Sequence, residues 1–183
     1  MVKENVYNNN KNNNYNYIMT QIDTLNQILK GWGYSDQIPE KGNENVLVNS
    51  NSEITSITFT NKNLKGDIPS SISIFTSLET LILNFNQLTG NIQSIDTLTN
   101  LQTLEINNNQ LSGNIPLLNT LTNLQSLLIN NNKLSGNIPS FDTLTNLNTI
   151  EINSNLLSGN IPSFDTLTNL QTLEIKYKQL SGN

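Results

Sequence analysis

The chain has 183 residues, of which 35% are hydrophobic, and it carries a formal net charge of −5. It contains no cysteine and no histidine, and its nine basic residues are all lysines. This composition excludes a thiol nucleophile, an imidazole base, zinc sites of the common kinds and a disulfide framework. With so few basic residues we expect no nucleic-acid partner. No residue pattern indicates a bound metal or cofactor.

The first 53 residues differ from the remainder of the chain. Residues 1–17 are rich in Asn and of low complexity, which predicts a disordered leader. This leader has no apolar run of the kind found in a secretory signal, and no stretch of the chain reaches the length of a membrane span.

Residues 18–53 are predicted to be an N-terminal capping segment with one helix. Apolar residues recur at helical spacing over 18–31, and Gly31 and Trp32 follow at the end of this pattern. Val46-Leu47-Val48 is consistent with a short covering strand. Such a segment would cover the apolar edge of a repeat array that begins after it. A ligand site around Trp32 is the alternative interpretation.

Residues 54–183 contain six repeats of one unit, the last of them incomplete. The units begin at Ile54, Leu78, Leu101, Leu124, Leu147 and Leu170. A period of about 23 residues indicates stacked coils. Within a unit, Leu104 and Ile106 alternate with polar residues, which predicts a short strand with one buried face. Apolar residues every third position before this strand favour a helical or 3-10 turn. Asn at the strand's end, as at Asn109, is predicted to hydrogen-bond the turn backbone.

These units resemble the plant-type leucine-rich repeat. The pattern Leu-x-x-Leu-x-Leu-x-x-Asn-x-Leu-Ser-Gly-Asn-Ile-Pro is clearest over residues 101–116. The resemblance is to the ectodomains of leucine-rich repeat receptor kinases and to polygalacturonase-inhibiting proteins. It implies an α/β solenoid, a right-handed superhelix with one parallel sheet on its concave side and short helical or 3-10 turns on its convex side. It also implies a binding role for the concave side, usually toward proteins or peptides.

The sequence departs from this resemblance at both ends of the array. The cysteine pairs that usually flank such arrays are absent, and Lys62 and Lys178 stand where Asn is expected. The chain also ends inside its sixth unit. Two explanations stay open: the sequence is a fragment of a longer array, or a partner protects the last coil.

The concave face is the predicted binding surface. Stacking places Thr58, Ile82, Glu105, Leu128, Glu151 and Glu174 in one outward column, with Asn84, Asn107 and Asn130 in the next. Exposed apolar residues in a polar field are favoured anchors for a partner. The candidate partner-binding residues are Ile82, Phe85, Glu105, Leu128, Glu151, Glu174 and Tyr177.

Other activities are weighed against this binding role. Glu151 and Glu174 would lie on adjacent strands at about the carboxyl separation of a retaining glycosidase. However, an open face offers no pocket to shift either pKa, and too few carboxylates converge there for a calcium site. Paired threonines such as Thr97 and Thr99 would suit an ice-binding surface only if they were extended, and the Leu spacing predicts that they lie in turns.

The sequence therefore predicts a non-catalytic scaffold that binds a protein or peptide through its concave face. A carbohydrate- or ice-surface-binding protein is the alternative. The chain has no Asn-x-Ser/Thr acceptor for N-glycosylation despite its many Asn residues. This absence favours a cytoplasmic location, while an extracellular one is the alternative if the chain is a fragment that lacks its signal.

Overall fold

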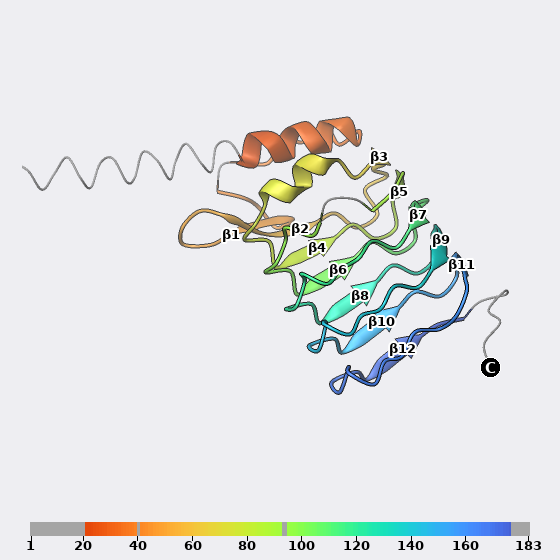
Figure 1. The fold of residues 1–183 in the computed structure, drawn as a ribbon. Helices are drawn as coiled ribbons and strands as arrows, with labels where there is room; N and C mark the ends of the chain where they lie inside the picture. Colours follow the sequence, from red (N-terminus) through yellow and green to blue (C-terminus); the bar gives the residue numbers. More distant parts are fainter. Residues whose placement is uncertain (1–20, 40, 93–94, 177–183) are drawn as a thin grey trace, which may run out of the picture.

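The computed structural model describes residues 21–39, 41–92 and 95–176, which form a stack of coils (Figure 1). Each coil contributes one strand to a sheet on one side and returns along the other side. The strands are β1 (Val46–Val48), β2 (Ile54–Thr58), β3 (Lys65–Asp67), β4 (Thr80–Ile82), β5 (Gln87–Thr89), β6 (Thr103–Glu105), β7 (Ser112–Asn114), β8 (Ser126–Leu128), β9 (Lys133–Asn137), β10 (Thr149–Glu151), β11 (Leu156–Ser158) and β12 (Thr172–Glu174).

The main sheet has seven strands in the order β1-β2-β4-β6-β8-β10-β12. All neighbours after β1 are parallel, and equivalent residues pair without a shift: Thr103 pairs with Thr80 on one side and with Ser126 on the other. This register follows from the constant repeat length, because each coil brings the same residue back to the same height. The predicted parallel solenoid is confirmed. β1 is the exception, since it pairs antiparallel with β2.

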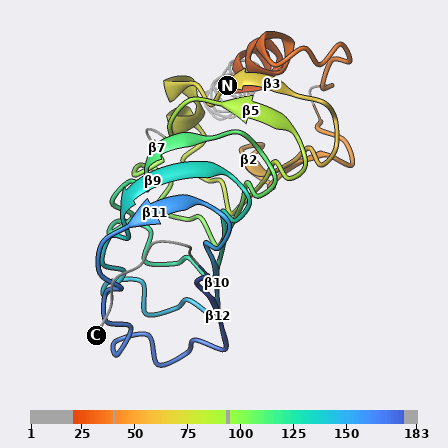
Figure 2. The ribbon, with the colours of Figure 1, turned by 90° about the vertical axis from the view of Figure 1, so that its right-hand side faces the viewer.

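Two smaller sheets lie along a second side of the coils, a feature that the sequence did not lead us to expect. One pairs β3 with β5, and the other has the order β11-β9-β7 (Figure 2). These strands contain the segment that follows the Asn at the turn of each unit, as Ser112 and Gly113 follow Asn109. The chain is extended there, so its backbone groups pair with the coil before it, as in the bond from the amide of Ser112 to the carbonyl of Gly90.

The convex side is made of tight turns. A 3-10 helix, η1 (Ser70–Ile74), occupies the first of them. In the later coils single turns replace it, each closed by backbone bonds three residues apart, such as Leu121 to Leu118 and Leu124 to Leu121. The predicted three-residue spacing of apolar side chains therefore corresponds to consecutive turns, which keep those side chains on the inner side.

The core is one continuous column of side chains. Leu104, Leu127 and Ile150 are at most 1% exposed, and they occupy the same position in three consecutive coils. Each coil buries its apolar residues only because another coil lies on either side of it. Each coil therefore needs a neighbouring coil on both sides, and the apolar residues at an end of the stack must be covered by another part of the structure.

The Asn residues at the strand ends link neighbouring coils through their side chains. The Asn109 Nδ2 donates to the carbonyl of Leu83 in the preceding coil at 2.9 Å and to that of Ile106 in its own coil at 3.1 Å. Its Oδ1 accepts from the amide of Leu88 at 3.0 Å. Asn132 and Asn155 repeat the arrangement. The predicted structural role of these amides is confirmed at atomic detail, because they satisfy backbone groups that no strand pairs.

The glycine within or directly after each side strand is required for steric reasons. Gly113 has a φ of 76°, a conformation that residues with a Cβ rarely adopt. A Cβ at Gly113 would also collide with the Oδ1 of Asn91 in the preceding coil. Close approach between coils and backbone conformation therefore both require glycine at this position.

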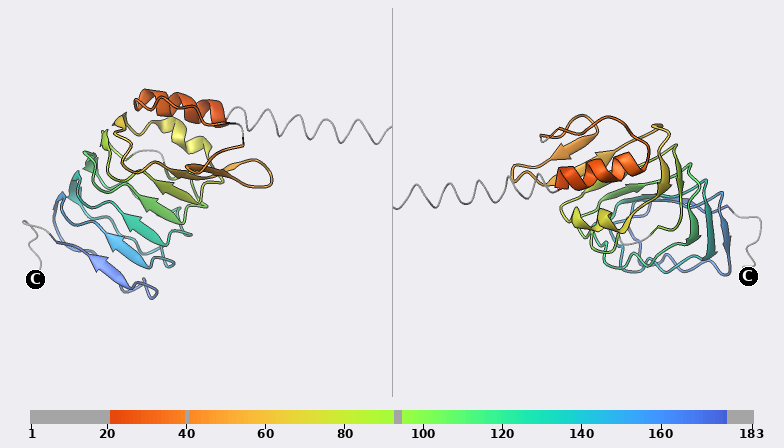
Figure 3. Two further views of the ribbon diagram at one scale, coloured as in Figure 1. Left: turned by 180° about the vertical axis from the view of Figure 1, so that it is seen from behind. Right: turned by 90° about the horizontal axis from the view of Figure 1, so that it is seen from above.

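The N-terminal segment covers the first coil (Figure 3). Residues 21–31 are helical, and the side chains of Leu25 and Leu29 are fully buried. Trp32 is 2% exposed, and its Nε1 donates to the carbonyl of Asp67 in β3 at 2.8 Å. The Oε1 of Gln21 accepts from the amide of Ile54 at the start of β2. The helix, Trp32 and β1 together close this end. The predicted leader and the beginning of the predicted helix lie outside the described residues.

Candidate functional site

The exposed face of the main sheet is defined by the alternation of residues along each strand. Leu104 points into the core, so Thr103 and Glu105 stand on the opposite face and are half-buried. The register places the equivalents of Glu105 in one column across the sheet. This column consists of Thr58, Ile82, Glu105, Leu128, Glu151 and Glu174.

The candidate residues differ in how much of each is available to a partner. Ile82, Glu105, Leu128 and Glu151 are half-buried, and Glu174 is exposed. Phe85 has 55% of its surface exposed and lies three residues after Ile82, beyond the end of β4. The register therefore brings five of the candidates to one face, and Phe85 follows the strand that carries Ile82. Tyr177 lies outside the described residues.

Phe85 has an unusual backbone conformation for its residue type. Its φ is 55°, in the left-handed region. The equivalent positions in other coils have φ values of 54° to 56°, and they are occupied by Asn61, Asn108, Asn131 and Ser154. Asn tolerates this region because its short side chain bonds locally, whereas a bulky aromatic does not. Phe85 is therefore the one large apolar residue among the five residues at this position, and the other four are Asn or Ser.

The column beside the candidates is more buried than the sequence suggested. Asn84, Asn107 and Asn130 were expected to be exposed on the concave face, but each has only 8% or 9% of its surface exposed. The Oδ1 of Asn84 accepts from the amide of Asn107, and its Nδ2 donates to the Oε2 of Glu105 at 2.8 Å. The expectation was wrong because these amides are buried at the ends of the strands, where the side chain of Asn84 bonds the next coil.

The Asn84 contact fixes one of the candidate carboxylates. Glu105 is held on the strand by the Nδ2 of Asn84, while the equivalent neighbour of Asn107 is Leu128, which has no acceptor in its side chain. The Oδ1 atoms of Asn107, Asn130 and Asn153 are buried without a hydrogen-bond partner. Among the four Asn residues of this column, only Asn84 therefore has a hydrogen-bond partner for its Oδ1 atom.

Acidic side chains accumulate toward the C-terminal end of the column. Glu151 pairs in register with Glu174 on one side and with Leu128 on the other, and Glu105 lies one strand beyond Leu128. Desolvation by burial raises the pKa of Glu151 above its ordinary value of 4.5, and repulsion from Glu174 and Glu105 adds to this rise. Within the described part of the chain, no lysine forms an ion pair with these three carboxylates. The column itself therefore carries net negative charge, while the exposed Lys176 stands two residues after Glu174.

The threonines weighed for ice binding have structural partners. Thr97, Thr120 and Thr143 each donate through Oγ1 to a backbone carbonyl of the preceding coil. The second threonine of each pair is exposed in the adjoining turn. The turn conformation expected from the Leu spacing is present, so the two hydroxyls of a pair do not form one flat row.

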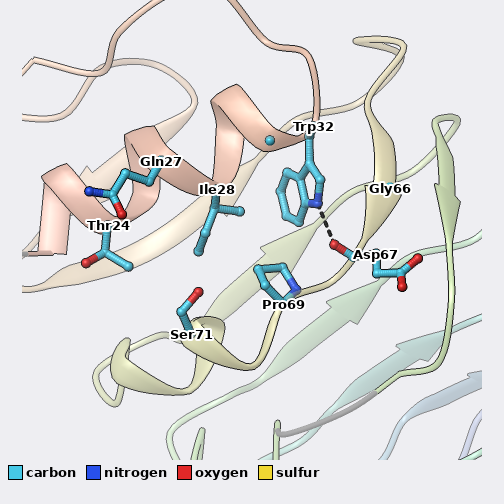
Figure 4. Close-up of a pocket in the computed structure, with 9 residues that line it drawn as sticks. Thr24, Gln27, Ile28, Trp32, Gly66, Asp67, Pro69 and Ser71 are labelled. Atoms are coloured by element: carbon cyan, nitrogen blue, oxygen red, sulfur yellow. Dashed lines mark hydrogen bonds between the residues drawn. The ribbon is translucent and has the colours of Figure 1, made fainter.

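The alternative ligand site at Trp32 is a pocket between the helix and the first coil. Its lining includes Thr24, Gln27, Pro69 and Ser71, and the indole of Trp32 extends toward β3 with its nitrogen directed at Asp67 (Figure 4). Because the indole is buried and its only donor is already used, Trp32 acts as packing and offers a ligand no hydrogen bond. No group of three or more metal-ligating side chains is found among the described residues.

Comparison with known proteins was made at three levels. No protein-family model matches the chain, and no curated protein matches it. Among solved structures, the ectodomain of the receptor kinase SOBIR1 from Arabidopsis thaliana aligns with a TM-score of 0.79 and 27% identity, over 87% of this chain and 94% of that one. The fold is that of the plant leucine-rich repeat ectodomains.

Two further similar structures differ in what they bind. The peptide hormone receptor RGFR1, solved in complex with RGF2, is 37% identical with a TM-score of 0.66, over 72% of this chain and 21% of the receptor. A plant ice-binding protein is 29% identical with a TM-score of 0.65, over 82% of this chain and 51% of that protein.

The resemblance deduced from the repeat pattern is thus confirmed, and the fold is one that typically serves as a non-catalytic binding domain. SOBIR1 and the related BIR2 structure are receptor ectodomains, which face the outside of the cell. The comparisons therefore give no support to the expected cytoplasmic location. No described helix is long and apolar enough to cross a membrane.

Proposed function

We propose that this protein is a non-catalytic scaffold that binds a protein or peptide along its concave face, with Phe85 as the principal anchor. Ile82 and Leu128 supply the adjoining apolar contacts, and Glu105, Glu151 and Glu174 supply the polar ones. The observation that carries this proposal is the exposed aromatic ring of Phe85 at a left-handed backbone position.

The conformation of Phe85 argues for function because it costs stability. A left-handed conformation costs a residue with a bulky side chain about 1–2 kcal/mol. The ring recovers little of this by packing, since more than half of its surface is exposed. Strain that the fold does not need is concentrated at ligand-binding positions in proteins. An exposed aromatic ring is also the residue type that dominates binding energy at interfaces.

The charge of the face defines the chemistry of the partner. Three carboxylates lie along the column without a balancing lysine, and the raised pKa of Glu151 reflects repulsion among them in addition to burial. A lysine or arginine side chain of a ligand placed beside Glu151 would relieve this repulsion. We therefore expect a partner that presents an apolar residue to Phe85 and basic residues to the acidic end.

The comparisons support a peptide as the ligand by analogy. RGFR1 was solved with the peptide RGF2, and the chain matches a part of that receptor with the same coil geometry. An extracellular binding event fits this analogy. The main sheet is preformed and long, so an extended peptide could contact several coils without reorganising the scaffold.

An ice- or carbohydrate-surface binder is the second candidate, and its support is the likeness to a plant ice-binding protein. It is the weaker candidate because the first threonine hydroxyl of each pair donates within the fold, as at Thr97, Thr120 and Thr143. Thermal hysteresis or inhibition of ice recrystallisation by the full chain would favour it over the peptide-binding scaffold.

Peptide display tests the proposal directly. A random peptide library would be selected against the full chain, and the selected peptides measured against Phe85→Asn, which introduces the residue found at the equivalent position of two neighbouring coils. We expect binding to weaken by roughly tenfold or more, and the selected peptides to be rich in Lys and Arg. The matched control is Leu156→Asn, which removes an exposed apolar side chain from β11, off the concave face. Peptides that bind both variants equally well would refute Phe85 as the anchor.

A further inference from the structure

Four neighbouring strands of the main sheet carry an alternating pattern on their exposed face. The strands are β4, β6, β8 and β10, and each of them has another described strand on both sides. At one position of these strands apolar and acidic side chains alternate from coil to coil, in the order Ile82, Glu105, Leu128 and Glu151. All four side chains are half-buried. The face therefore repeats the same chemistry every two coils.

The repeat distance of this alternation selects the conformation of a ligand chain that runs along the stack. Neighbouring parallel strands lie about 4.8 Å apart, so two coils span roughly 9.6 Å. A polyproline II chain has three residues per turn and rises about 3.1 Å per residue, so it presents the same face every ~9.3 Å. An extended β-chain does so about every 6.7 Å, and two turns of an α-helix take about 10.5 Å. The polyproline II chain therefore has the closest repeat, with a difference of about 0.3 Å.

Hydrogen-bond donors flank the alternating residues on both sides. The residues two positions earlier in the same strands all carry hydroxyl groups, and they are Thr80, Thr103, Ser126 and Thr149. Two positions later lie Asn107 and Asn130. Within the described part of the chain these hydroxyls and the Nδ2 groups of these two amides make no hydrogen bond, whereas the Nδ2 of Asn84 donates to Glu105. A polyproline II chain has no internal hydrogen bonds, so its carbonyl groups need such external donors, and an α-helix does not.

From the period, the flanking donors and the charge we propose that the ligand of the concave face is a proline-rich peptide in the polyproline II conformation. It carries an apolar residue at every third position and a lysine or arginine between successive apolar residues. The apolar residues contact Ile82 and Leu128, and the basic residues contact Glu105 and Glu151. The exposed ring of Phe85 suits this ligand, because proline-rich segments dock on aromatic side chains. This inference rests on the proposed function and adds the conformation and the sequence period of the ligand.

The period of the peptide is the first test, with the binding of labelled peptides to the full chain measured by fluorescence anisotropy. The probe is a peptide of three Leu-Pro-Arg units, in which the proline after each leucine restrains that leucine to extended or polyproline II backbone. One control has the same residues reordered so that the three leucines are adjacent. A second control keeps the period and replaces each proline with glycine, which removes the preorganisation. We expect each control to bind roughly tenfold or more weakly than the probe.

An exchange of two residues tests the same period from the side of the protein. The double variant Glu105→Leu with Leu128→Glu keeps the composition and the net charge of the face, but it places apolar side chains on the adjacent strands β4 and β6. The spacing between the apolar contacts then falls to about 4.8 Å. We expect the Leu-Pro-Arg peptide to bind roughly tenfold more weakly and the reordered peptide to change little. Thermal unfolding verifies that the variant retains its fold, since Glu105 loses its bond from Asn84.

The results separate this inference from the proposed function. If the Leu-Pro-Arg peptide binds no better than its two controls, while peptides selected from a random library bind and are weakened by Phe85→Asn, the polyproline II ligand is wrong and the proposed function stands. If neither the Leu-Pro-Arg peptide nor any selected peptide depends on Phe85, Ile82 or Leu128, both are wrong. Equal affinity of the probe for the wild-type chain and for the folded exchange variant would also overturn the inference.

Discussion

The two ends of the described stack differ in how their apolar residues are covered. At the N-terminal end, a helix, the buried ring of Trp32 and the antiparallel strand β1 cover the first coil. At the other end, the last described coil exposes Leu173 and Ile161, whose equivalents elsewhere are buried. Repeated coils can extend a core to any length, but a regular coil has no residues that cover the apolar surface at the end of the stack. At the N-terminal end this closure comes from residues that break the repeat.

The ends also differ in how far they depart from the repeat. Irregular residues gather in the first coils, where Ile82 occupies a column position that is acidic in three later coils and Phe85 occupies one that is Asn or Ser in others. The later coils are close copies of one another. The residues that repeat from coil to coil maintain the stack, whereas the residues that differ between coils are available for recognition. The comparison therefore places the capping segment and the most irregular candidate residues at the same end of the stack.

Removing the indole at the closed end is the change with the largest expected effect. Trp32→Ala would open a cavity between the helix and the first coil and leave the carbonyl of Asp67 without its donor. We expect a loss of about 3–5 kcal/mol in the free energy of unfolding, measured by denaturant titration. Trp32→Phe is the matched variant, because it retains most of the packing and loses the hydrogen bond. If Trp32→Ala cost less than 1 kcal/mol, the N-terminal segment would not be closing the stack.

One leucine position allows the interior and the open end to be compared directly. Leu104→Ala removes a side chain that is 1% exposed and should cost about 2–5 kcal/mol. Leu173→Ala removes the equivalent side chain at 43% exposure and should cost about 1 kcal/mol in the monomer. Equal costs for the two variants would contradict the exposure of Leu173.

The sequence was sufficient to predict the architecture because the repeat is constrained at every coil. Leu104 and Ile106 alternate with polar residues, and Asn109 stands where a turn needs both a donor and an acceptor. The repeat period, the alternation along the strand and the Asn at the turn therefore all predict the same fold. The side strands β7, β9 and β11 were not predicted, since their pairing depends on how closely consecutive coils approach, and no single repeat reveals that distance.

The candidate site was predicted less completely. The column containing Glu105 and Leu128 could be placed from the strand alternation alone. The burial of Asn84 and Asn107 could not, because it results from contacts between coils at the strand ends. The conformation of Phe85 could have been inferred from the Asn residues at the same position in other coils, since Asn is the residue that most tolerates left-handed backbone.

Restoring the repeat at Phe85 should separate stability from binding. Phe85→Asn replaces a strained aromatic with the residue found at Asn108 and Asn131, so we expect the free energy of unfolding to increase by about 1 kcal/mol. Thermal unfolding of the two chains measures this gain. The reciprocal control is Asn108→Phe, which should lose stability by a similar amount. A destabilised Phe85→Asn variant would mean that the ring packs on the fold and is not held ready for a partner.

The smallest expected effect concerns the acidic end of the same face. Burial and the neighbouring Glu174 and Glu105 raise the pKa of Glu151 in the folded chain above the unfolded value near 4.5. The folded state therefore binds the proton more tightly, and folding stability falls as the pH rises through this window. Below the unfolded pKa both states are protonated and the penalty disappears.

Glu151→Gln removes that titration and should make the chain slightly more stable than the wild type at neutral pH, with no gain in acid. The measurement is a series of thermal unfolding curves from acidic to neutral pH. Glu79→Gln, which removes a carboxylate from an exposed residue outside the column, is the control. Adding a bound basic peptide should cancel the gain, because its cation would then make the carboxylate of Glu151 favourable. If Glu151→Gln were more stable than the wild type even with the peptide bound, the acidic end would not be a site for basic residues, and binding would depend on the apolar anchors of the first coils alone.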